Sequence, residues 1–291
     1  MKVTGFTFIR NAIKFDYPVV EAIRSILPLC DQMVVAVGNS EDATRELIAS
    51  IDPGKIKIIE TVWDDSLREG GRVLAQETDK AFAAIDADTD WCFYIQGDEV
   101  IHEQYYPAIR EAMQRWKDDL SVDGLLFHYL HFYGSYDYVG IAPGWYRNEI
   151  RIVRRNPGIY SYKDAQGFRK NRGEKLTVVP VDAYVYHYGW VKEPTAMQRK
   201  QETFTKLWHD DEWVEKHVRK ADAFDYVTHI DALQHFNGTH PEVMKERIAQ
   251  RNWKFDYDLS FNKLTIKQKL KNFIQDKLKY NLSYQNYILK K

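Results

Sequence analysis

The first 130 residues alternate between short apolar segments and segments with helical periodicity. The apolar segments are residues 3–9, 32–37, 56–59, 91–95 and 122–129. Between them, helical spacing of apolar residues is found at residues 18–29, 40–51, 69–85 and 107–116. Strands that alternate with helices usually pair in parallel, because each helix returns the chain across the sheet. The sequence therefore predicts an α/β fold with a Rossmann-like, mostly parallel sheet flanked by helices.

The pattern changes after about Tyr133, where loops rich in Gly, Tyr and Arg begin. Two short strand patterns follow, at residues 176–179 and 183–186. The rest of the chain is polar and has helical periodicity. We therefore predict one sheet domain over residues 1–190 and a mainly helical extension over residues 191–291.

Residues 262–291 form a basic segment, with eight Lys, one Asp and a net charge of +7. Five apolar residues of this segment fall on one helical face: Ile266, Leu270, Phe273, Ile274 and Leu278. Such a basic amphipathic helix can lie on an anionic membrane. It can equally pack on its own domain with its lysines in water, and this second interpretation is favoured.

The net charge, the two cysteines and the length of the apolar stretches limit what kind of protein this can be. The net charge of −1 gives no reason to expect a nucleic-acid partner. Cys30 and Cys92 both lie in apolar segments, which is typical of buried thiols in a reducing compartment. The sequence begins without an apolar leader and has no apolar stretch of membrane-spanning length. We expect a cytoplasmic protein; if residues 262–291 do not pack on their own domain, they would provide a peripheral contact with the inner face of the membrane.

Two acidic residues, Asp98 and Glu99, follow the apolar segment 91–95. Open α/β sheets bind ligands beyond the carboxyl ends of their strands. A carboxylate there can hold a divalent cation against a diphosphate. The alternative is that one of these acids caps a helix that begins near His102.

Several motifs, taken in order, resemble the family-two glycosyltransferases, which have the GT-A fold. Residues 8–11, Phe-Ile-Arg-Asn, end the first strand much as the family's Asn-Glu does. Residues 37–44, Val-Gly-Asn-Ser-Glu-Asp-Ala-Thr, stand where the family typically has Asp-Asp-Gly-Ser-Thr-Asp-Gly-Thr. The helix 71–84 precedes Gln-Gly-Asp-Glu at 96–99, which stands where the family has Asp-x-Asp. The resemblance covers about residues 3–190.

The resemblance implies an inverting transferase that moves a sugar from a nucleotide-sugar donor to a hydroxyl of a glycan or lipid-linked acceptor, as in surface polysaccharide synthesis. It also implies a Mn²⁺ or Mg²⁺ ion held by Asp98 and by His187, which ends a strand pattern and is followed by Gly189. The alternative for His187 is a hydrogen-bonded histidine at a strand end.

The chain departs from the family at three acidic positions. Val37 and Gly38 replace the acidic pair that often contacts the nucleotide, so other groups must recognise the base. Gln96 replaces the first Asp of the metal motif. We expect Asn11, Asn39 and Gln96 to line the nucleotide side of the site.

Four arginines cluster at residues 147–155, and in a strand Arg147, Arg151 and Arg155 share one face. A guanidinium group can bond two phosphate oxygens at once. We expect Arg151 and Arg154 or Arg155 to face phosphate; the alternative is a solvated basic edge strand.

A carboxylate after the metal strand should take the proton of the acceptor hydroxyl. Asp164 is the first choice for this base, and Glu149 and Asp137 are alternatives. A single Asp in a loop is more often a turn former.

Three rival functions stay open. The absence of acidic residues at Val37, Gly38 and Gln96 favours a non-catalytic nucleotide-sugar or glycan-binding relative. A glycosidase would need two separated carboxylates, whereas Asp98 and Glu99 are adjacent. A nucleotidyltransferase would be expected to have a glycine-rich basic loop after its first strand, and residues 10–14 are not one.

Overall fold

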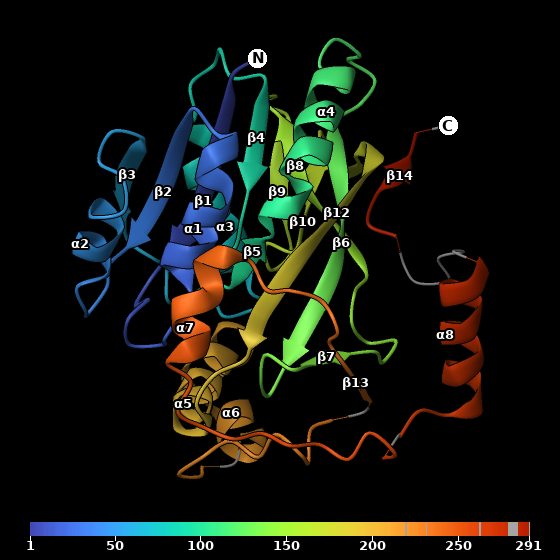
Figure 1. Cartoon of the computed structure of the whole chain (residues 1–291). Helices are drawn as coiled ribbons and strands as arrows, with labels where there is room; N and C mark the ends of the chain where they lie inside the picture. Colours follow the sequence, from blue (N-terminus) through green and yellow to red (C-terminus); the bar gives the residue numbers. More distant parts are fainter. Residues whose placement is uncertain (219, 231, 262, 279–284, 291) are drawn as a thin grey trace.

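The computed structural model describes residues 1–218, 220–230, 232–261, 263–278 and 285–290 (Figure 1). Its main sheet has 11 strands. They are β1 (Val3–Ile9), β2 (Gln32–Gly38), β3 (Ile56–Thr61), β4 (Trp91–Tyr94), β5 (Glu99–Ile101), β6 (Gly124–Tyr133), β7 (Tyr138–Gly140), β8 (Asn148–Arg154), β12 (Thr177–Trp190), β13 (Leu233–His235) and β14 (Ile288–Leu289). A second sheet consists of β9 (Ile159–Tyr162), β10 (Gly167–Lys170) and β11 (Glu174–Lys175).

The strand order of the main sheet begins β3-β2-β1-β4, and these four strands pair in parallel. Strand β8 lies between β4 and β6 and is antiparallel to both. Strand β12 then pairs in parallel with β6 and antiparallel with the short β5. The predicted α/β fold class is confirmed, and the sheet becomes mixed beyond β4.

Helices cover both faces of this sheet (Figure 1). The helices are α1 (Val19–Ile26), α2 (Thr44–Ala49), α3 (Arg72–Ala83), α4 (Tyr106–Trp116), α5 (Pro194–Phe204), α6 (Asp211–His217), α7 (Lys245–Ala249) and α8 (Ile266–Leu278). Helices α1, α2 and α4 share one apolar core with the sheet, while α3 and the β9–β10 hairpin share the other.

Strand β2 is apolar after Gln32 because it is buried on both faces of the sheet. Met33, Val35 and Val37 belong to the first core, and Val34 and Ala36 to the second. Successive side chains of a strand point to opposite faces, so a strand buried on both faces has no polar positions.

The chain after residue 190 wraps around the lower end of the sheet in Figure 1 and returns to its edge. It contains α5 to α8 and extended segments, and its strands β13 and β14 pair with β7 and β12. The two strand patterns predicted at 176–179 and 183–186 are one strand, β12, with a register shift between Pro180 and Tyr184. The domain boundary at residue 190 stays a prediction.

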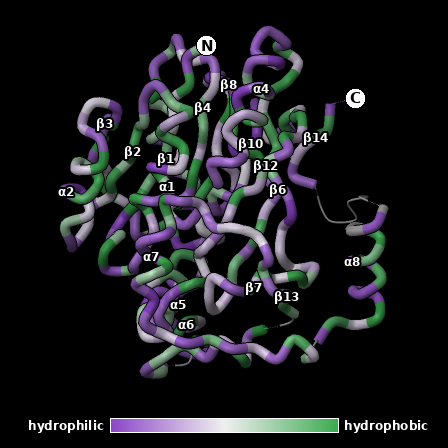
Figure 2. The backbone as a smooth tube through the Cα atoms, viewed as in Figure 1, coloured by the Kyte–Doolittle hydropathy of each residue, from purple (hydrophilic) through white to green (hydrophobic). Residues whose placement is uncertain are grey.

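Helix α8 carries hydrophobic and hydrophilic positions along its length (Figure 2). Ile266, Leu270 and Phe273 are 87%, 57% and 59% exposed. Asn272 instead faces the protein, where its side-chain amide donates to the carbonyl of Ile141 over 2.8 Å. The prediction that the apolar face of this helix packs on its own domain is therefore wrong for Ile266, Leu270 and Phe273. These three side chains are exposed, and the polar Asn272 makes the contact with the domain. No helix within the described part of the chain has the length and apolar character needed to cross a membrane.

Candidate functional site

The loops after β1, β2 and β4 meet at one edge of the sheet, beside the end of β12. Strand β4 ends at Tyr94, and a short turn carries the chain through Asp98 into β5. Strand β5 pairs antiparallel with β12 so that Glu99 stands opposite His187. The backbone amide of Tyr188 also donates to the carbonyl of Asp98 over 2.8 Å. This pairing is what brings Asp98 next to His187.

Asp98 and His187 line one cavity of about 220 Å³. Asp98 Oδ1 lies 3.8 Å from His187 Nε2. A Cβ atom at Gly189 would stand 2.7 Å from Asp98 Oδ2 and 2.8 Å from His187 Nε2. Glycine is therefore required at this position, since any side chain would displace both groups.

Lys200 also lines this cavity, and the sequence analysis did not single it out. Its Nζ lies 3.4 Å from Asp98 Oδ2 and donates to the carbonyl of Gly189 over 2.9 Å. It comes from α5, on the buried side that also carries Ala196 and Met197. A lysine at a buried position of an amphipathic helix was the signal that could have found it.

These neighbours set the protonation of the site. Burial alone opposes ionisation of Asp98, but Lys200, His187 and Lys192 outweigh it and lower the pKa of Asp98. Burial lowers the pKa of His187, and Asp98 only partly opposes this. An ionised carboxylate and a neutral imidazole are the forms in which these residues ligate metals.

Asp98 and His187 fit a divalent cation as two of its ligands. Asp98 Oδ1 and His187 Nε2, a carboxylate oxygen and an imidazole nitrogen, are atom types that ligate divalent cations, and they lie 3.8 Å apart. Among the described residues no group of three His, Cys, Asp or Glu could hold a metal. Mg²⁺ is commonly bound by one or two carboxylates together with substrate phosphates, so the remaining ligands would come from a bound diphosphate and water.

A second cavity, of about 370 Å³, adjoins the first and shares Arg10, Tyr17, Trp63, Lys200 and Phe204 with it. We call it the outer cleft. Its other lining residues include Lys14, Phe15, Arg68 and Lys206. Three acids line it as well, and they pair with its cations: Asp65 with Arg10, Glu41 with Lys14, and Asp211 with Arg68 and Lys206.

The three residues predicted to line the nucleotide side of the site, Asn11, Asn39 and Gln96, do not all lie in one cavity. Asn11 lines the outer cleft, and its Oδ1 accepts from the backbone amide of Glu41 over 2.7 Å. Gln96 lines the Asp98 cavity and donates to the carbonyl of Ala165 over 3.1 Å. Asn39 is exposed, lines neither cavity, and accepts from the amide of Trp63 over 3.2 Å.

Trp63 explains the departure at Gly38. A Cβ atom at Gly38 would lie 2.3 Å from Trp63 Nε1. The indole therefore fills the space that an acidic side chain would need, and it lies where it lines both cavities. Sequence reasoning missed Trp63 because a lone Trp after a strand is usually a core residue.

Asp164 lines the Asp98 cavity from the turn between β9 and β10. Its neighbours Lys163 and Ala165 have φ of 57° and 64°, in the left-handed region that non-glycine residues rarely adopt. Burial raises the pKa of Asp164. Asp98, His187 and Asp164, which are far apart in sequence, thus meet at one cavity.

The arginines of β8 lie elsewhere, which corrects the expectation that they face phosphate. Arg151 is fully buried and forms a two-pronged ion pair with Glu99, with distances of 2.7 and 2.8 Å. Arg155 donates to the carbonyls of Ala83 and Ile85. Arg154 donates to four carbonyls, those of Trp116, Lys117, Asp119 and Val122. Their donors serve the fold, so these arginines are not brought to the Asp98 cavity.

The two alternative bases also lie outside this cavity. Glu149 lines a third cavity, where its Oε1 accepts from Gln166 Nε2 over 2.8 Å. Asp137 pairs with Arg251 over 2.6 Å, at the turn before β7. The Asp98 cavity therefore has Asp164 as its own carboxylate beside Asp98.

Comparisons with known proteins give distant structural likenesses only. No protein-family model and no curated protein matches the sequence. Similar solved structures include S. aureus TarS, with 14% identity and a TM-score of 0.40 over 69% of this chain and 38% of that chain.

TarS 1–349 in complex with UDP has 12% identity and a TM-score of 0.39, over 76% of this chain and 68% of that one. Glucosyl-3-phosphoglycerate synthase from Mycobacterium tuberculosis, in complex with Mn²⁺, UDP and phosphoglyceric acid, has 16% identity and a TM-score of 0.30, over 45% of this chain and 43% of that one. At TM-scores of this size the chain is not assigned to a family.

Proposed function

We propose that the protein is a glycosyltransferase of the GT-A type, which moves a sugar from a nucleotide-sugar donor to an acceptor hydroxyl. The observation that carries this proposal is the meeting of Asp98, His187 and Asp164 at one cavity beyond the sheet edge. The cavity adjoins an outer cleft lined by aromatic rings and by cations that pair with acids, and a nucleoside diphosphate would stack on the rings and take the place of these acids at the cations.

The donor would lie across the two cavities. Its base would meet the aromatic rings of the outer cleft, among them Trp63, and its diphosphate would pass Arg10 and Lys200, which line both cavities. Asn11 would contact the same nucleotide. These fixed cations would stabilise the negative charge that grows on the leaving diphosphate.

Asp98 and His187 would hold Mn²⁺ or Mg²⁺. When bound, such an ion supplies a Lewis acid that neutralises charge on the diphosphate oxygens. Lys200 would keep Asp98 ionised and in place, since it contacts the second carboxylate oxygen.

Asp164 would act as the general base. It would take the proton of the acceptor hydroxyl as that oxygen bonds to the sugar carbon and the bond to the nucleoside diphosphate breaks. One displacement of this kind inverts the configuration of the sugar carbon. A burial-raised pKa makes the carboxylate of Asp164 a stronger base than an exposed one.

The acceptor would be a glycan or a lipid-linked glycan, as in surface polysaccharide synthesis in the cytoplasm. Helix α8 supports a peripheral membrane contact, because Ile266, Leu270 and Phe273 are exposed among lysines. The inner leaflet is anionic and attracts such a helix.

A donor-hydrolysis screen tests the proposal. The full chain would be incubated with UDP, GDP, CMP and dTDP sugars, with Mn²⁺ or Mg²⁺, and release of free sugar would be measured. We expect metal-dependent hydrolysis of one donor, and its loss in Asp98→Asn. Donor binding without hydrolysis or transfer to any acceptor would support a non-catalytic nucleotide-sugar-binding protein instead.

A further inference from the structure

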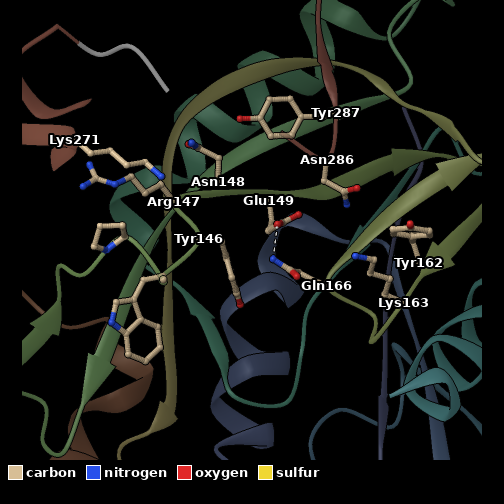
Figure 3. A pocket seen from close by; sticks show the side chains of 13 residues that line it. Tyr146, Arg147, Asn148, Glu149, Tyr162, Lys163, Gln166, Lys271, Asn286 and Tyr287 are labelled. Carbon is tan, nitrogen blue, oxygen red and sulfur yellow. Dashed lines mark hydrogen bonds between the residues drawn. The ribbon is translucent and has the colours of Figure 1, made fainter. Parts of the chain in front are cut away.

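A third cavity, of about 410 Å³, is lined by the side chains drawn in Figure 3. Tyr146 and Gln166 line both this cavity and the Asp98 cavity. The mechanism above does not use this third cavity. We call it the side cavity.

Three cationic side chains line the side cavity from three different elements. Arg147 precedes β8, Lys163 lies in the β9–β10 turn, and Lys271 belongs to α8. Figure 3 shows Arg147 and Lys271 side by side at one end, with Lys163 at the other. Arg147 is held in place by Asn272 Oδ1, 3.3 Å from its Nη2. Such a spread of charge suits an anionic ligand that spans the cavity.

Aromatic rings provide the rest of the wall. They come from Trp145, Tyr146, Tyr162 and Tyr287. The flat face of an aromatic ring packs against the apolar face of a sugar ring, and a hydroxyl at its edge can hydrogen-bond. The side cavity is therefore lined both by aromatic rings that can pack against a sugar and by cations that can bind an anionic group.

Two residues that line the cavity each have a buried oxygen atom with no hydrogen-bond partner among the described residues, Glu149 Oε2 and Asn286 Oδ1. Buried polar atoms are rarely left unsatisfied, so the wall of this cavity is unusual in its hydrogen bonding. Burial raises the pKa of Glu149 to about 8. Its carboxyl group is then mostly neutral near pH 7 and does not cancel the three cations.

We propose that the side cavity is an acceptor subsite for an anionic sugar unit, one that bears a phosphate or a carboxylate group. This inference rests on the proposed function and narrows its acceptor to charged glycans. The reacting sugar would lie beside Asp164, and the chain would pass Tyr146 and Gln166 so that an adjoining unit enters the side cavity. Phosphate and carboxylate share the chemistry that these cations recognise.

Binding of defined oligosaccharides to the full chain tests the proposal. The probes are phosphomannan oligosaccharides, oligogalacturonates and neutral malto-oligosaccharides, and calorimetry at low and high salt measures affinity. Arg147→Gln/Lys271→Gln removes two cations of the side cavity. Lys216→Gln/Lys254→Gln is the matched control, because these lysines are exposed and line none of the three cavities.

We expect one anionic class to bind, more weakly at high salt. The side-cavity variant should bind it about tenfold or more weakly, and the control should match the wild type. Donor hydrolysis in water should be unchanged in both variants, so loss of hydrolysis in the wild type would count against the proposed function alone.

Three results would overturn the subsite: equal binding by the side-cavity variant and the wild type, preference for the neutral oligosaccharides, or no binding of any probe. A drop in affinity for the free nucleoside diphosphate in the side-cavity variant would assign the cavity to the donor, which also overturns it.

Discussion

At the residue scale, the site depends on charges that are held in place inside the protein. The pKa of Asp98 is lowered despite its burial, and the nearby ammonium group of Lys200 contributes most to this. Gly189 leaves the space in which the carboxylate and the imidazole approach each other. At Asp164, by contrast, burial outweighs the nearby Lys163, and the pKa is raised. The two carboxylates of one cavity therefore suit different roles, one as a ligand and one as a base.

Asp164→Asn removes the proposed base while keeping the size of the side chain. We expect kcat for transfer to fall by about 10²- to 10⁴-fold, because that is the usual contribution of a positioned base. The KM for the donor should change little, since Asp164 would face the acceptor. Steady-state kinetics with the donor found in the screen would measure both. A variant with wild-type kcat would remove Asp164 from the mechanism.

Glu149→Gln tests the buried carboxyl group of the side cavity through stability. The pKa of Glu149 is raised from 4.5 to about 8 in the folded protein. Between these values the folded chain holds a proton that the unfolded chain has lost, so this residue makes the free energy of unfolding fall as pH rises. Glu149→Gln lacks this contribution. Its free energy of unfolding should therefore fall less between pH 5 and 8 than that of the wild type, by on the order of 1 kcal/mol per pH unit.

Urea denaturation at pH 5, 6.5 and 8 gives the comparison. Glu215→Gln is the control, because Glu215 is exposed on α6 and should leave the wild-type pH dependence unchanged. Parallel curves for the wild type and Glu149→Gln would show that the carboxyl group titrates normally.

At the element scale, the strands and helices that the sequence predicted best are those whose environment is uniform. Strand β2 is apolar after its first residue, Gln32, because both of its faces are buried. The long strand β12 was divided in two, because its register shift interrupts the pattern near Asp182. The short strand β5 was not predicted, although its pairing with β12 is what brings Asp98 next to His187.

The candidate site residues also differed in how far local sequence could predict them. Asp98 and His187 could be found because strand ends collect ligands, whereas Lys200 comes from a helix whose docking on the sheet no local pattern reveals. Arg151 was assigned to phosphate because nothing in the sequence identifies Glu99 as its buried partner. Their ion pair joins β8 to β5 and is a matter of tertiary packing.

Helix α8 provides a prediction of its own. Leu270→Ser/Phe273→Ser should weaken binding to vesicles that contain anionic lipid by roughly 100-fold, since each buried apolar side chain contributes about 1.5–3 kcal/mol. Cosedimentation with anionic and neutral vesicles measures this. Val62→Ser/Leu120→Ser is the control, because both residues are exposed outside α8. Equal vesicle binding by wild type and the α8 variant would exclude α8 as the contact.

At the scale of the whole molecule, three cavities adjoin one another. The outer cleft shares Lys200 with the Asp98 cavity, which in turn shares Tyr146 with the side cavity. Helix α8 contributes Lys271 to the side cavity, so the exposed basic helix and the proposed acceptor subsite are neighbours. Donor, reacting centre and acceptor would thus follow one another, with the acceptor end next to the surface that would meet a membrane.

The most direct test of the account is the binding of Mn²⁺ to the full chain, followed by electron paramagnetic resonance with and without UDP, GDP, CDP or dTDP. We predict that one of these diphosphates lets the wild type bind one Mn²⁺ tightly, and that Asp98→Asn weakens this binding by about 100-fold or more, because an ionised ligand is lost. Equal Mn²⁺ binding by Asp98→Asn and the wild type, in the presence of the same diphosphate, would contradict the account.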